Sequence, residues 1–402
     1  AAAIYLAFFR SAAVPGTQAP AQRPAGGALP GSGRAQPATS TVSGPNNLPG
    51  GTGRPNAFPG AADQAGRAEE PGPVSRTTPV VDEETRFVAA GSGVQPGSLR
   101  FYSAADGKFY RTDASGRLTP LSDKAFYNVQ TVSWGQTTDQ AVLEFPDGSN
   151  ILYDFQQNRQ VTLPKHWEDF TFAPGDGQIV AKSVGNNESN RFLVIANPDG
   201  SDAQAVQELG DNAAKVKTAW APNNQIVAYA HTGDPLGYDR EQVVLIGRNQ
   251  ENLPALITEG RGLVTNWSPA GQSLLYSVHA SGNGYLPELW VGGGTAETMN
   301  QNRRRLELNT WADKCGWSSE QILVCAVPDR LETGAGLQRD AARKGPDQIV
   351  RIDLRTGQKT NLGYVDGVAD VQSVTPAPDG QAAFLLDRAS GRIVRFDLRA
   401  SL

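Results

Sequence analysis

The pattern of apolar and polar positions changes near residue 82. From there to the end of the chain, short apolar runs alternate with turns rich in Gly, Asn, Asp and Pro, as in the stretch 99–118. No long stretch in this region has a convincing helical period. Evenly spaced short strands predict an all-β domain, which would be a sandwich, a barrel or a propeller.

A repeat within this region favours the propeller. A unit has a large aromatic residue, small polar and turn residues that often include Pro, and then an apolar strand, as in WAPNNQIVAYA from Trp220 and WSPAGQSLLYS from Trp267. In the last unit a proline stands in place of the aromatic residue. The six units start at Trp134, Phe172, Trp220, Trp267, Trp317 and Pro376. Successive starts lie between 38 (134 to 172) and 59 (317 to 376) residues apart, close to the length of one propeller blade.

The physics of one unit accounts for this pattern. The aromatic residue ends one strand and packs between neighbouring blades, and the turn then reverses the chain. The next strand is apolar because it lies deep in the sheet. Two further strands follow most units, as in 191–206 and 347–363, so the sequence predicts blades of four antiparallel strands.

These units resemble the WD40-like (PD40-type) repeats of TolB-like propellers, whose hallmark is an aromatic-Ser-Pro-Asp-Gly turn. WSPAG at 267–271 and APDG at 377–380 match best, and APGDG at 173–177 and WAPNN at 220–224 are near matches. The other two units lack the proline. The resemblance covers about 320 residues and implies the fold, but such propellers host many functions.

The number of blades follows from the spacing. The region 82–402 divided by the mean spacing of about 48 residues corresponds to between six and seven blades. Seven is favoured, and six remains the alternative. The last unit lacks an outer strand, so we expect an early strand around 84–90 to complete it and leave no open sheet edge.

The N-terminal part of the chain has a different character. Residues 1–10 begin with nine apolar residues before Arg10, which we interpret as the C-terminal part of a transmembrane segment. A signal-peptide remnant and a plain apolar terminus are the alternatives. In 11–80, 24 of 70 residues are Pro or Gly and Phe58 is the only aromatic residue, so 11–81 is predicted to be a disordered linker. The propeller domain would then be 82–402.

Bulk charge and motifs exclude several functions. The net charge of −5 argues against a nucleic-acid partner. The sequence has no nucleophile elbow, no phosphate-binding glycine loop and no zinc-protease motif. We therefore expect no cofactor, no metal and no catalytic residue, and a protein that is not an enzyme.

The two cysteines flank one of the repeat turns. Paired residues of a hairpin have a constant sum of residue numbers, and Cys315 and Cys325 are centred on 320, within that turn. They should face each other across adjacent strands and form a disulfide in an oxidising compartment. Two buried free thiols are the alternative. The closed loop is short, so the bond should stabilise the fold by no more than about 3 kcal/mol.

Loop lengths indicate a binding face. Three consecutive loops between second and third strands are long, at 231–241, 279–288 and 328–347, and they should form one continuous rim. Ordinary solvated loops are the alternative, but Tyr and Arg are favoured at interfaces. The candidate binding residues are His231, Asp234, Tyr238, Asp239, Arg240, His279, Asn283, Tyr285, Arg330, Arg339 and Arg343.

Together these observations predict a membrane-tethered propeller of the cell envelope, periplasmic or at the cell surface. It would be a monomeric domain that binds or scaffolds a protein or peptide. The alternative is an extracytoplasmic hydrolase or lyase that acts on a glycan through carboxylates at the propeller channel.

Overall fold

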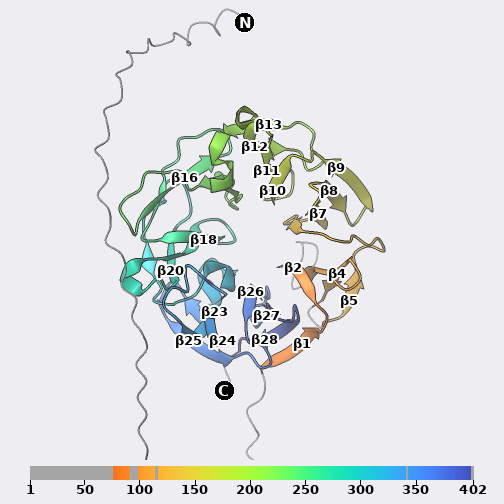
Figure 1. Cartoon of the computed structure of the whole chain (residues 1–402). Helices are drawn as coiled ribbons and strands as arrows, with labels where there is room; N and C mark the ends of the chain where they lie inside the picture. Colours follow the sequence, from red (N-terminus) through yellow and green to blue (C-terminus); the bar gives the residue numbers. More distant parts are fainter. Residues whose placement is uncertain (1–75, 91–97, 114–115, 341–342, 400–402) are drawn as a thin grey trace, which may run out of the picture. The chain divides into compact units, whose positions relative to one another are not determined.

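The computed structural model describes residues 76–399 apart from 91–97, 114–115 and 341–342. This region forms seven four-stranded antiparallel sheets arranged around one axis (Figure 1). The predicted seven-bladed, all-β propeller is therefore confirmed. The predicted anchor at 1–10 and nearly all of the predicted linker at 11–81 lie outside the described residues.

Each blade is built from four strands in sequence order, from the axis outward, except the last. Blades 1 to 3 are β2 (Thr85–Ala90), β3 (Leu99–Ser103), β4 (Lys108–Thr112), β5 (Leu118–Pro120); β6 (Thr131–Trp134), β7 (Gln140–Glu144), β8 (Asn150–Asp154), β9 (Arg159–Leu163); and β10 (Trp167–Phe172), β11 (Ile179–Val184), β12 (Arg191–Ala196), β13 (Gln204–Glu208). Blades 4 to 6 are β14 (Val216–Thr218), β15 (Ile226–Ala230), β16 (Glu241–Gly247), β17 (Leu256–Thr258); β18 (Arg261–Trp267), β19 (Ser273–His279), β20 (Glu288–Gly293), β21 (Arg304–Arg305); and β22 (Cys315–Ser319), β23 (Ile322–Leu331), β24 (Arg343–Asp353), β25 (Lys359–Tyr364).

Blade 7 joins the two ends of the domain. Its inner strands are β26 (Val371–Pro376), β27 (Ala382–Asp387) and β28 (Ile393–Asp397), and its outermost strand is β1 (Thr77–Val81). The expected closure by an early strand is present, but the strand is not the one at 84–90. That stretch forms β2, the innermost strand of blade 1, while β1 lies before the predicted domain start at 82.

The repeat positions of the sequence lie where the sheets meet. Each falls near the end of the innermost strand of blades 2 to 7. Trp134, for example, packs against Phe109 of blade 1 at 5.5 Å between ring centroids, and its indole N–H donates to the backbone oxygen of Phe87. Seven large clusters of buried apolar residues lie between adjacent blades, so the core is a ring of seams between sheets.

The proline that replaces the aromatic residue in the last repeat has a steric explanation. A Cβ atom added at Gly316 would lie 2.3 Å from the Cδ atom of Pro376 and 2.4 Å from the backbone oxygen of Val374. Blades 6 and 7 thus approach each other closely at this point. The compact proline ring fits this space, where the sequence pattern predicts an aromatic residue.

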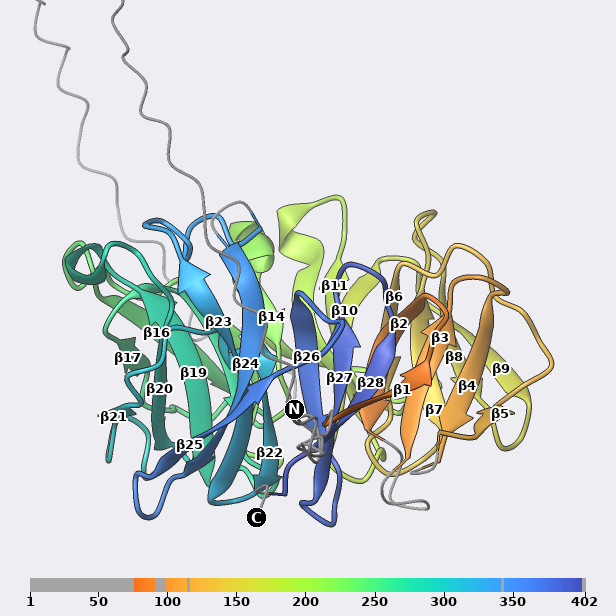
Figure 2. The ribbon, with the colours of Figure 1, turned by 90° about the horizontal axis from the view of Figure 1, so that it is seen from below.

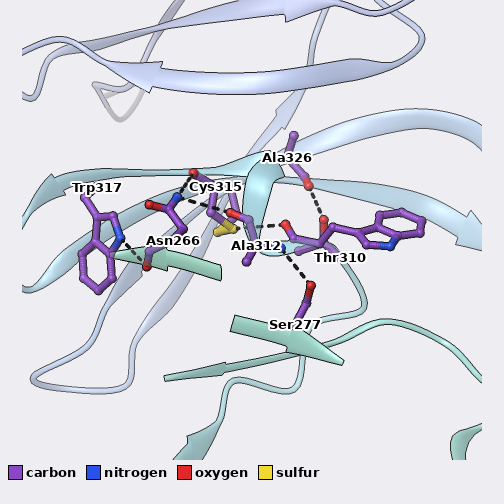
Figure 3. The surroundings of a disulfide bond; sticks show 9 residues. Asn266, Ser277, Thr310, Ala312, Cys315, Trp317 and Ala326 are labelled. Carbon is purple, nitrogen blue, oxygen red and sulfur yellow. Dashed lines mark hydrogen bonds between the residues drawn. A yellow bond between two sulfur atoms is a disulfide. The ribbon is translucent and has the colours of Figure 1, made fainter. Parts of the chain in front are cut away.

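The predicted disulfide is present. Cys315 and Cys325 are direct partners in the register of β22 and β23, and their sulfur atoms are bonded (Figure 3). The surroundings link blade 6 to blade 5, because the Asn266 side-chain amide donates to the backbone oxygen of Cys315 at 2.7 Å. A disulfide favours an oxidising compartment. Among the described residues, no helix has the length and apolar character needed to cross a bilayer.

Candidate functional site

The three long loops follow the second strands of blades 4, 5 and 6, and all lie on one face of the propeller (Figure 2). We call the loops 231–241, 279–288 and 328–347 the rim. The third was predicted as one long loop, but much of it is strand. Pro328 pairs with Asp347 and Arg330 with Lys344 beyond a bulge. A long irregular loop would leave backbone groups unpaired, so the hairpin of β23 and β24 continues past the sheet.

Hydrogen bonds join the three loops into one surface. The backbone N–H of Ser281 donates to the Asp239 carboxylate at 3.0 Å, which ties the second loop to the first. The N–H of Gly334 donates to the Gly284 oxygen at 2.8 Å, and that of Gly336 to the Tyr285 oxygen at 2.7 Å. The second loop therefore bridges the other two, as the loop order in the sequence predicts.

A small apolar cluster supports the rim from below. It contains the buried residues Trp311 and Ala335 and the partly buried Leu286 and Leu331. Arg339 covers this cluster, with its guanidinium carbon 4.5 Å from the Trp311 ring and Nη1 2.7 Å from the Asp313 carboxylate. Arg339 therefore already has partners within the chain, and these contacts hold the third loop against the cluster.

The rim also exposes aromatic and apolar side chains. Tyr238 is 69% exposed and its hydroxyl accepts a hydrogen bond from Tyr285 at 3.3 Å. Arg261 lies over the Tyr238 ring at 5.5 Å. Leu236 and Leu337 are also exposed, the latter by 60%. Sequence reasoning missed Arg261, Leu236 and Leu337, because Arg261 begins an inner strand and the leucines carry no chemical signal.

Several of the predicted binding residues already have partners within the chain. The His231 ring lies 2.7 Å from the Glu241 carboxylate, and Arg240 lies 3.1 Å from Glu259. The Asn283 amide donates to the Leu286 oxygen at 2.9 Å. The backbone N–H of the exposed Asp234 donates to the Gln242 side chain.

The two remaining arginines lie on the extended hairpin, and His279 lies behind the rim. Arg330 is exposed on β23, while Arg343 begins β24 and its side chain lies outside the described residues. Burial lowers the pKa of His279, and the charge of Arg261 acts in the same direction. A Cβ atom at Gly336 would lie 2.4 Å from the Cβ of His279, so only glycine fits beside this ring.

A second group of charged side chains lies on the two inner strands of blade 3, β10 and β11, and at the end of β7 in blade 2. Lys182 is buried, 3.0 Å from the Glu168 carboxylate and 3.6 Å from that of Asp169. The N–H of Asp169 donates to the Glu144 carboxylate at 3.2 Å. Burial raises the pKa of Glu144, and the nearby acidic charges of Asp169 and Glu168 add to this effect. Such a carboxyl can hold a proton at a higher pH than an ordinary one.

No metal site is evident in the described part of the chain, where no group of three or more His, Cys, Asp or Glu side chains is placed to hold an ion.

Comparison with known proteins identifies the fold alone. No family model and no curated protein matches the sequence. The β-propeller domain of Cps50 (Swd1) from Myceliophteria thermophila is similar with a TM-score of 0.53 and 12% identity, over 80% of this chain and 100% of that one. An oligogalacturonate lyase in complex with manganese has a TM-score of 0.54 and 13% identity, over 80% and 93%. The oligogalacturonate lyase of Vibrio parahaemolyticus has a TM-score of 0.53 and 10% identity, over 80% of this chain and 93% of that one.

These neighbours correct one prediction. The missing catalytic motifs indicated that the protein is not an enzyme, yet two of the neighbours with this fold are lyases. In a propeller, catalytic groups come from separate blades and therefore leave no continuous motif in the sequence. The absence of a continuous motif therefore does not support the prediction that the protein is not an enzyme.

Proposed function

We propose that this protein is a TolB-like propeller that binds a protein or peptide through the rim. The observation that carries the proposal is that the rim exposes Tyr238, Leu236 and Leu337, with Arg261 over the Tyr238 ring. Hydrogen bonds and the Trp311 cluster hold the loops that carry these side chains. Aromatic residues and arginine dominate the energetics of protein interfaces. Loops supported by a rigid scaffold suit recognition, because little ordering is needed on binding.

The proposal includes the place of the propeller in the cell. Residues 1–10 would anchor the chain in a membrane and 11–81 would act as a flexible tether, with a monomeric propeller outside the cytoplasm. The disulfide between Cys315 and Cys325 supports such a compartment. Thiol alkylation of the protein in intact cells tests it, because a reduced pair in cells would argue against this location.

Rim substitutions should abolish partner binding. We expect the double variant Tyr238→Ala with Leu337→Ala to lose roughly 100-fold or more in affinity, because it removes the two most exposed large hydrophobic side chains of the rim, at 69% and 60%. The partner is first captured from envelope extract with residues 69–402, which include the closing strand, and its affinity is then measured by titration.

Tyr127→Ala provides a matched control. Tyr127 is 68% exposed, close to the value for Tyr238, but lies on the connection between blades 1 and 2. The Tyr127→Ala variant should bind the partner with the same affinity as the unaltered protein. Equal binding by all three proteins would show that the rim is not the contact surface.

Glu144 favours a second candidate function, the cleavage of an acidic glycan. Its raised pKa suits a general acid, and Lys182 lies beside the neighbouring carboxylates. With oligogalacturonate as the test substrate, we expect Glu144→Gln to abolish any formation of the unsaturated product, followed by ultraviolet absorbance. Lack of activity in the unaltered protein, or full activity in Glu144→Gln, would eliminate this assignment.

A further inference from the structure

Blade 4 has an incomplete outer strand. β17 pairs only with Glu241, Gln242 and Val243, whereas β16 continues to Gly247. In blade 2, by comparison, β9 pairs with β8 along all five residues of that strand. Within the described ranges, no strand lies on the outer side of residues 244–247. A strand edge of this kind presents backbone N–H and C=O groups that a further strand can pair with.

The chain between β16 and β17 does not pair with this edge as a strand. The Glu251 carboxylate folds back on Asn249 and accepts its backbone N–H at 2.7 Å. Leu253 then packs into the seam between blades 4 and 5. The Gln250 side chain reaches in the other direction, to the Val206 oxygen of blade 3 at 3.0 Å. No described strand therefore occupies the position of a longer β17, although residues 250–253 of the connection line it.

A groove of about 580 Å³ lies at this position, between the uncovered part of β16 and the outer strand β13 of blade 3. Its wall is mixed: Val206, Leu209, Val216 and Ile246 form an apolar part, and polar side chains such as Gln207 and Asn252 line the rest. Val244 also lines it and is 37% exposed, although it is on the third strand of a blade. A side chain of a segment bound in the groove would bury Val244.

A second hollow lengthens the groove. It measures about 350 Å³, shares Val206 and Gln250 with the first, and reaches Arg248 and Gln178 near the opposite face. The two hollows follow β13 for its five residues, which correspond to about 17 Å of extended chain. The space thus matches a short extended peptide in length.

The charges along the larger hollow are of one sign. Glu208 and Glu251 line it, both are exposed, and none of its lining residues is Lys or Arg. A basic side chain near the groove would therefore be attracted, and an acidic one repelled.

We propose that this groove binds an extended segment of a partner protein, which adds as a strand beside residues 244–247 and completes blade 4. The segment runs antiparallel to β16, in line with β17. Apolar residues at alternate positions face the groove wall, and Lys or Arg residues between them face Glu208 and Glu251. The groove meets the rim at Thr232 but is not lined by Leu236, Tyr238 or Leu337, so the inference stands without the proposed function of the rim.

A displayed library of random heptapeptides tests the proposal, selected on the full chain and counter-selected on the variant Val244→Lys. We expect enriched peptides with alternating apolar residues and a basic residue. The best peptide, synthesised and titrated, should lose roughly 10-fold or more in affinity on Val244→Lys and on Glu208→Lys. Methylation of its alternate backbone nitrogens should abolish binding, because strand addition depends on backbone hydrogen bonds.

Two variants serve as controls. Leu118→Lys places the same charge on an outer strand of blade 1, at a residue of similar exposure, 42%, and should leave the affinity unchanged. Tyr238→Ala should also have no effect, which separates this groove from the rim. Glu208→Lys alters only an exposed side chain, so the test does not depend on the folding of Val244→Lys.

The remaining outcomes overturn the proposal. Selection that yields no peptide able to distinguish the full chain from Val244→Lys would show that the groove does not recognise extended segments. Full affinity of the methylated peptide would exclude strand addition. Loss of binding on Tyr238→Ala with retention on Val244→Lys would move peptide binding to the rim.

Discussion

A chain that begins at residue 82 will be less stable than one that begins at residue 69 by roughly 5 kcal/mol, because it lacks β1. This strand closes blade 7, where Thr77, Thr78 and Pro79 pair with β28. Val81 is buried in the seam between blades 7 and 1. The loss of β1 removes both the burial of apolar side chains and the backbone hydrogen bonds to β28, and it leaves β28 as an open edge.

Urea unfolding followed by tryptophan fluorescence measures this difference. The full chain and the chain from residue 69 should have the same midpoint, since both contain β1. The chain from residue 82 should unfold at a clearly lower concentration, and should aggregate more readily through the open edge of β28. Equal midpoints for the chains from 69 and 82 would mean that the closure contributes little to stability.

Replacement of Lys314 by Met should cost about 3–5 kcal/mol of stability, because it leaves a buried carboxylate without its cation. Lys314 is fully buried, and its Nζ lies 2.8 Å from the Asp347 carboxylate and 3.1 Å from that of Asp370. Asp347 is also buried and accepts the backbone N–H of Val371 at 2.6 Å. The three side chains connect blades 6 and 7 at the base of the β23–β24 hairpin.

Lys359→Met is the matched control for this second prediction. Its ammonium lies 3.1 Å from the Glu307 carboxylate, but the Glu307 side chain is 69% exposed and that of Lys359 32%, so the loss should be below about 1 kcal/mol. The double variant Lys314→Met with Asp347→Leu should regain much of the lost stability, because it no longer buries a lone charge. Unfolding free energies that are the same for Lys314→Met and Lys359→Met would contradict this interpretation.

The stability and binding predictions concern different parts of the molecule. Asp347 of the Lys314 group pairs with Pro328 at the base of the third rim loop, which carries Leu331 and Ala335, so its loss should also loosen this loop. Hydrogen exchange in residues 328–340 of Lys314→Met, measured under conditions where the protein stays folded, would report this coupling. The groove between blades 3 and 4 lies far along the ring and should be unaffected.

The repeats alone were enough to predict the propeller and to favour seven blades over six. Each repeat turn is a local feature, since the residues that form it are neighbours in the chain, and six such features in order leave few other folds. The cysteine pairing was predictable for the same reason. Cys315 and Cys325 flank one turn, so the register of a single hairpin decides their contact.

The tertiary structure decided which strand closes the ring and which residues form surfaces. The stretches 77–81 and 85–90 both have β character, and only the packing of blade 7 against blade 1 selects the first as the outer strand. Arg261 meets Tyr238 across two blades. Lys314 meets Asp347 and Asp370 over 33 and 56 residues. The groove exists because β17 stops short of the end of β16. Strand patterns along a chain are local, whereas closure, buried ion pairs and open edges depend on which sheets come together.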